Sequence, residues 1–129
     1  MIRIAHLLTG IWVGGSEQMV LEFCRHRDRT RFECVVAAPT AGGIADEIRR
    51  AGTPVYTGPA AHQEAVREAD LINLHWCDYE PSMLARVQAA AKPYVITLHW
   101  PVPLPKLPGV KICTSDYARD VQGDRKSVV

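Results

Sequence analysis

Short apolar runs of β-forming residues alternate with segments of helical periodicity along the whole chain. This alternation favours βαβ units and a parallel sheet, and therefore an α/β fold. The nearly continuous apolar character of residues 2–8 fits a strand that helices cover on both faces. Expected strands cover residues 2–8, 34–38, 54–57, 71–75, 94–98 and 110–113, and expected helices cover 16–27, 44–51, 63–69 and 115–122, with another between Pro81 and Pro93.

Several residues mark the expected helix ends. Ser16 is suited to cap the first helix, because its hydroxyl can accept hydrogen bonds from first-turn amides. Gly52 follows the second helix, where a left-handed residue is needed. Pro81 fits a first helical turn and Pro93 ends the same helix, whose buried face we expect to include Ala91.

Length and charge limit the possible classes of protein. The 129 residues, 47% of them apolar, can bury one core but are too few for two ordinary domains. We therefore expect a single domain over residues 1–129. The net charge is only +1, which gives no reason to expect nucleic acid or an anionic membrane as a main partner.

The four cysteines, Cys24, Cys34, Cys77 and Cys113, contain no Cys-x-x-Cys pair and lie mostly within apolar runs. This pattern favours buried reduced thiols over disulfides or zinc ligands, and it favours the cytoplasm. No basic segment precedes an apolar run at the start of the chain, and no apolar run approaches the roughly 18 residues of a membrane span. We expect a soluble, unprocessed, cytoplasmic chain.

Glycines are concentrated between the first expected strand and the first helix, at Gly10, Gly14 and Gly15. Adjacent glycines let a ligand approach the backbone, and the first amides of a helix are unpaired and carry partial positive charge. A phosphate or diphosphate can bind there without a metal or a lysine. The pattern is not GxGxxG and no acidic residue ends the second strand, so NAD is disfavoured. A tight turn that only leads into the helix is the alternative.

The fourth and fifth expected strands end in similar tetrapeptides, Asn-Leu-His-Trp at 73–76 and Thr-Leu-His-Trp at 97–100. If both strands are parallel, both His-Trp pairs emerge at the carboxyl edge of the sheet, beside the glycine segment. Ligands of open α/β sheets bind at that edge, so we expect the site there.

The histidines leave several roles open. His75 and His99 can act as acid or base, donate to a polar substrate, ligate a metal, or be structural. No carboxylate or cysteine has convincing ligand spacing to either, so we expect no metal. His6 is expected to be buried in the first strand, whereas His26 and His62 are expected to be exposed.

Trp12, Trp76 and Trp100 all fall in segments expected at the same edge. An indole there can stack on a sugar or a base while its N–H makes a hydrogen bond, or it can simply pack against neighbouring loops. Glu17 can contact an acceptor hydroxyl or only complement the positive end of its own helix.

Together these segments resemble the N-terminal domain of the family-four, retaining glycosyltransferases of GT-B fold. The similarity covers the whole chain in the family's order. The matching pieces are Ile-Arg-Ile-Ala-His (2–6), Gly-Gly-Ser-Glu (14–17), Ala-Asp-Leu-Ile-Asn-Leu-His-Trp (69–76), Val-Ile-Thr-Leu-His (95–99) and Cys-Thr-Ser-Asp-Tyr (113–117). By analogy with other doubly wound sheets, we expect a Rossmann-like sheet of about six strands in the spatial order 3-2-1-4-5-6.

The resemblance implies transfer of a hexose-like group from a nucleotide-diphosphate sugar to a hydroxyl acceptor, with retention of configuration and without a metal or other cofactor. It implies that His99 is the catalytic contact to the transferred sugar and that Gly14, Gly15 and Ser16 bind the donor diphosphate. Acceptor contacts are expected from Trp12, Glu17, His75, Trp76 and Trp100. After His99 the chain departs from the family, because a tryptophan and several prolines follow where relatives often carry an acid and a partly helical segment.

In that family a C-terminal domain holds the nucleotide, and residues 1–129 contain no counterpart of it. Residues 126–129 resemble the start of a further strand, so we expect the chain to break off before the last strand and the linker. We expect no activity from the chain alone, but activity with the missing domain supplied in cis or in trans. The alternative is a noncatalytic binding module or split-enzyme subunit, and an open sheet edge makes self-association an expectation.

Overall fold

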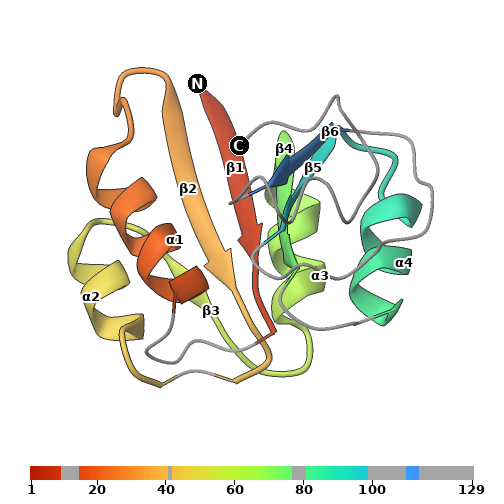
Figure 1. The fold of residues 1–129 in the computed structure, drawn as a ribbon, viewed down its shortest axis with the longest axis horizontal. Helices are drawn as coiled ribbons and strands as arrows, with labels where there is room; N and C mark the ends of the chain where they lie inside the picture. Colours follow the sequence, from red (N-terminus) through yellow and green to blue (C-terminus); the bar gives the residue numbers. More distant parts are fainter. Residues whose placement is uncertain (10–14, 41, 77–80, 99–109, 114–129) are drawn as a thin grey trace.

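The structure is a computed structural model that describes residues 1–9, 15–40, 42–76, 81–98 and 110–113 (Figure 1). The expected helix at 115–122 lies outside these residues. Within them, no helix combines the length and the apolar character needed to cross a membrane.

One parallel sheet forms the centre of the described chain. Its six strands are β1 (Ile2–Leu7), β2 (Phe32–Ala37), β3 (Val55–Tyr56), β4 (Leu71–Trp76), β5 (Tyr94–Leu98) and β6 (Val110–Cys113). Their spatial order is β3-β2-β1-β4-β5-β6, and every neighbouring pair is parallel. The prediction of an α/β fold with this strand order is confirmed, and the arrangement is compatible with a Rossmann-like single domain.

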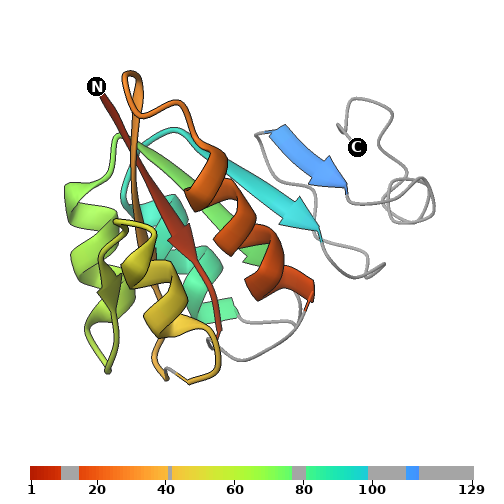
Figure 2. The same cartoon turned by 90° about the vertical axis from the view of Figure 1, so that its left-hand side faces the viewer.

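Helices cover both faces of the sheet (Figure 1 and Figure 2). On one face lie α1 (Gly15–His26) and α2 (Ala45–Arg50), and on the other lie α3 (Ala61–Glu68) and α4 (Pro81–Ala89). Successive side chains of a strand point to opposite faces, so Ile4 and Leu8 pack with α1 and α2, whereas Ala5 and Leu7 pack with α3 and α4. Burial on both sides explains why β1 is apolar along nearly its whole length.

Strand addition reverses direction between β1 and β4. From β1 the chain adds β2 and then β3 on one side, and after α3 it crosses to add β4, β5 and β6 on the other side. This junction is the topological switch point of the sheet, and ligands of doubly wound folds bind outside the carboxyl ends of the strands at such a point.

Two expectations about helix ends were wrong. The first helix begins at Gly15, so Ser16 lies inside the first turn instead of capping it. Ala91 is exposed, because α4 ends at Ala89 and Ala91 adopts a φ of 53° in the turn before the next strand. The expected stop at Gly52 is confirmed, with a φ of 85° just after α2.

Candidate functional site

The carboxyl ends of β1 and β4 lie side by side at the switch point. Leu7, the last residue of β1, is the register partner of Leu74, and β4 continues past this pair through His75 and Trp76. The first helix starts at Gly15, near the end of the sheet to which β1 points, and runs back along the strand (Figure 2). The start of α1 and the end of β4 therefore lie at the same edge, as the sequence predicts.

The structure brings together part of the expected site. Gly15 and Ser16 begin α1, Glu17 follows in the same turn and is half-buried, and His75 and Trp76 end β4. Trp12, Gly14, His99 and Trp100 lie outside the described residues, so their roles stay predictions.

His75 is buried within the sheet, with 3% of its surface exposed, and does not lie in a loop. Its Nε2 lies 3.0 Å from Nδ1 of His6, which is 1% exposed. The two rings share a face because His6 pairs in register with Asn73, two residues before His75. The strand continues to Trp76, one residue further than predicted, and this extension keeps the imidazole inside the sheet.

A second polar pair lies on the same face of the neighbouring strands. The hydroxyl of Thr97 donates a hydrogen bond of 2.7 Å to Oδ1 of Asn73. Thr97 is 1% exposed and pairs in register with His75. On the side of the sheet that α1 covers at β1, the face of β4 and β5 is thus polar near the carboxyl edge. This feature was not predicted from the sequence.

A buried cluster at the centre of the α1 face was also missed. A ring nitrogen of His6 and the sulfurs of Cys24 and Cys34 all lie within 4.8 Å of one another, and all three residues are buried. Both cysteines are free thiols, as expected. Burial lowers the pKa of His6 to about 4, which keeps its ring neutral at pH 7. Because its Nδ1 is engaged by His75, Nε2 is left as a buried polar atom with no hydrogen-bond partner among the described residues.

A hydrogen bond between the two thiols sets their ionisation order. It lowers the pKa of Cys24 and raises the pKa of Cys34, as expected if the Cys34 thiol donates to the Cys24 sulfur. Arg27 and Arg29 add a weaker electrostatic effect that favours the thiolate of Cys24. Cys24 is therefore the sulfur that ionises first.

The prediction that His62 is exposed was wrong. Only 5% of its surface is exposed, and its Nε2 lies 2.7 Å from the carbonyl oxygen of Leu8. The cause is the start of α3 at Ala61, two residues earlier than expected, which turns His62 inward. His62 thereby ties the start of α3 to the chain just after β1.

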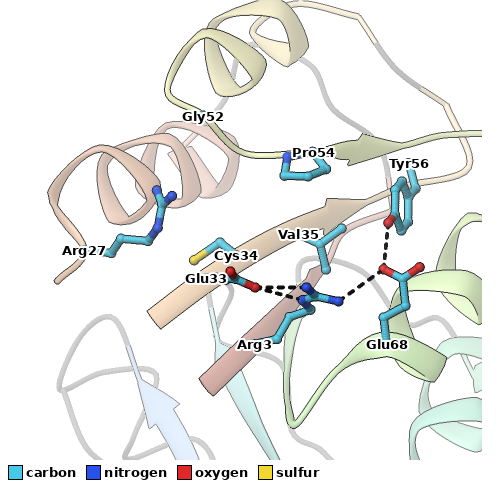
Figure 3. A pocket seen from close by; sticks show the side chains of 9 residues that line it. All are labelled: Arg3, Arg27, Glu33, Cys34, Val35, Gly52, Pro54, Tyr56 and Glu68. Atoms are coloured by element: carbon cyan, nitrogen blue, oxygen red, sulfur yellow. Dashed lines mark hydrogen bonds and ion pairs between the residues drawn. The ribbon is translucent and has the colours of Figure 1, made fainter. Parts of the chain in front are cut away.

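A hollow of about 430 Å³ lies at the opposite, amino edge of the sheet (Figure 3). Most of its polar side chains pair with one another: Arg3 donates to Glu33 at 2.9 Å, and the Tyr56 hydroxyl donates to Glu68 at 2.7 Å. The hydrogen bond to Glu68 raises the pKa of Tyr56. Solvent screens exposed ion pairs of this kind, so they contribute little to stability, and the paired groups satisfy each other without a ligand.

Comparisons of the chain with models of known protein families, with curated proteins and with solved structures find no significant match.

Proposed function

We propose that residues 1–129 form the acceptor-binding, N-terminal domain of a retaining GT-B glycosyltransferase, which moves a sugar from a nucleotide-diphosphate donor to a hydroxyl acceptor. The observation that carries the proposal is the position of Gly15 and Ser16. They start α1 at the carboxyl end of the sheet, beside the switch point between β1 and β4. A helix N-terminus at this place is suited to hold a diphosphate.

In this proposal the domain acts by positioning the substrates. Backbone amides at the start of α1 offset the charge that develops on the leaving diphosphate, so this step needs no metal. His99 contacts the transferred sugar, and Gly14, Gly15 and Ser16 hold the donor. The acceptor side consists of Trp12, Glu17, Trp76 and Trp100, and His75 supports this edge from its buried position in β4. A C-terminal donor-binding domain, in cis or in trans, closes over this edge in the cytoplasm.

Diphosphate binding to the chain tests the proposed edge. In an amide NMR titration with uridine diphosphate and guanosine diphosphate, we expect the largest shifts at Gly15, Ser16 and Glu17. The amino-edge residues Arg3 and Glu33 are the internal reference and should not move. Shifts confined to the amino-edge hollow, or no shifts at millimolar nucleotide, would contradict the proposal and favour a noncatalytic interaction module.

A matched pair of substitutions separates the backbone from the side chain. Ser16→Pro removes one amide within the first helical turn, where proline is tolerated, and Ser16→Ala removes only the hydroxyl. A hydrogen bond to a charged group contributes about 1.5–3 kcal/mol, so Ser16→Pro should weaken binding roughly tenfold or more, and Ser16→Ala should weaken it less. Equal losses would mean that the amide does not contact the diphosphate. Circular dichroism checks that both variants retain their helix content.

Turnover is the second test. The chain alone should not transfer sugar, and the chain combined with a GT-B donor domain should transfer it with the anomeric configuration retained. Transfer by the isolated chain would show that it is not half of an enzyme.

A further inference from the structure

Three elements bring one buried cluster together on the α1 face of the sheet. His6 comes from β1, Cys24 from α1 and Cys34 from β2, and the potential ligand atoms lie within 4.8 Å of one another. None of these residues belongs to the carboxyl-edge site proposed above. We propose that His6, Cys24 and Cys34 bind a zinc ion that joins β1, β2 and α1.

The donor atoms suit this metal. Two sulfurs and an imidazole nitrogen form a soft to borderline set, which favours Zn²⁺ over Mg²⁺ or Ca²⁺. Two thiolates balance the charge of a divalent ion, so the complex is neutral and can be buried at little electrostatic cost. Three protein ligands leave one tetrahedral position for water or another ligand.

The distances require only a small adjustment. Zinc lies about 2.3 Å from sulfur and about 2.0–2.1 Å from nitrogen, so ligands of a tetrahedral ion are roughly 3.5–3.8 Å apart. Starting from atoms within 4.8 Å, rotation of the side chains has to close the cluster by at most about 1.3 Å. His6 and Cys34 already lie on the same face of adjacent strands, two register positions apart, because Ile4 is the register partner of Cys34.

The histidine pair gives an independent reason to expect a ligand. His6 uses Nδ1 for His75, and its Nε2 is buried without a hydrogen-bond partner in the described part of the chain. A buried polar atom without a hydrogen-bond partner loses its hydration with nothing in return. Coordination of Nε2 would remove this cost, and the bond from Nδ1 to His75 is the arrangement by which metal-binding histidines are held in place.

The direct test uses the full 129-residue chain, purified under reducing conditions without chelator. Mass spectrometry of the metal content should give one zinc per chain after incubation with Zn²⁺ and removal of excess metal. With Co²⁺ as a probe, a sulfur-to-cobalt charge-transfer band should appear and saturate at one equivalent. A folded chain that takes up neither ion overturns the proposal. So does a chain that forms a Cys24–Cys34 disulfide instead of binding metal under the same reducing conditions.

Substitutions locate the site. Cys24→Ala, Cys34→Ala and His6→Gln should each abolish stoichiometric zinc binding. His26→Gln replaces an exposed histidine of α1, the helix that carries Cys24, and should leave zinc binding unchanged. Retention of one zinc in the Cys24→Ala/Cys34→Ala double variant would overturn the proposal. Amide NMR spectra confirm that each variant is folded, and the wild-type metal content decides the question if a variant does not fold.

His75 supplies a graded readout. It contacts a proposed ligand and not the metal, so His75→Phe should weaken metal binding roughly 10–100-fold while the cobalt charge-transfer band is retained at saturation. An unchanged affinity would remove His75 as a positioning residue. Loss of the band at saturating Co²⁺ would contradict the proposed set of ligands.

Discussion

Nδ1 of His6 and Nε2 of His75 lie 3.0 Å apart, so one side-chain hydrogen bond joins β1 to β4 across the switch point of the sheet. Only one of the two nitrogens can carry the shared proton. The pair is almost completely shielded from water, so neither ring can be replaced without consequence for the other.

Replacing His75 by phenylalanine should destabilise the metal-free chain by about 1–3 kcal/mol, because Nδ1 of His6 is left buried and unpaired. Urea denaturation in the presence of a chelator measures the change. His26→Phe is the control, because His26 is exposed and its ring bonds to the exposed Glu22, and it should change stability by less than about 0.5 kcal/mol. Equal effects of the two substitutions would show that the buried pair contributes nothing specific.

Replacing Thr97 by valine should cost about 1 kcal/mol. The change keeps the shape of a side chain that is 1% exposed but removes the hydrogen bond to Asn73. Thr57→Val, at an exposed position, is the matched control and should be nearly neutral. Chemical denaturation compares the two, and a neutral Thr97→Val would mean that Asn73 finds another partner.

Alanine at Gly52 or Gly58 should destabilise the chain by about 1 kcal/mol or somewhat more, since both glycines have left-handed backbones, with φ of 85° and 96°. A Cβ at Gly58 meets no atom within 4 Å, whereas one at Gly52 meets the end of the Arg29 side chain at 3.4 Å. Because that side chain is flexible, the two costs should be similar. A much larger loss for Gly52→Ala, measured by thermal denaturation, would show that Arg29 cannot move aside.

The hydrogen bond from Tyr56 to Glu68 raises the tyrosine pKa above its usual value of 10. Its contribution to stability is therefore present below pH 10 and is lost as the pH rises through the folded-state pKa. Glu68→Gln should lower the Tyr56 pKa toward 10, and Glu64→Gln should lower it less, because Glu64 acts only through its more distant charge. NMR titration of the Tyr56 ring gives both values, and the reverse ranking would contradict the assignment.

His99→Ala, made in the chain joined to a donor domain, should lower kcat by roughly a hundredfold if His99 contacts the transferred sugar. The KM for the acceptor should change less than kcat, because the contact stabilises the transition state more than it binds the acceptor. Steady-state kinetics separate the two constants. Unaltered turnover would remove His99 from the site.

Strand order and fold class could be predicted because they depend on patterns that the chain repeats many times. Each strand is short and apolar, each helix has a recognisable period, and connection rules leave few ways to arrange them. The side of a helix on which a given residue lies was harder to predict. His62 and Ala91 were placed wrongly because a shift of two residues in a helix end moves a side chain from one side to the other.

The His6, Cys24 and Cys34 cluster could not be predicted from spacing, because its members come from three elements and form no short motif. A signal was nevertheless present. His6 alternates with Ile4 in β1 and with Leu8 just after it, and Cys34 alternates with Val36 in β2. Both therefore belong to the layer that Val20 and Cys24 of α1 cover. Combining the strand alternation with the apolar face of the helix would have placed all three in one layer.

The shortness of β3 has a consequence for how copies of this chain meet. Among the described strands, β3 and β6 end the sheet, and β3 pairs through only two residues, Val55 and Tyr56. Two residues present too few free amides and carbonyls to template a strand from another molecule. The short β3 therefore disfavours fibre-like stacking of copies through this edge, and among the described strands β6 is the other edge from which an intermolecular sheet could grow.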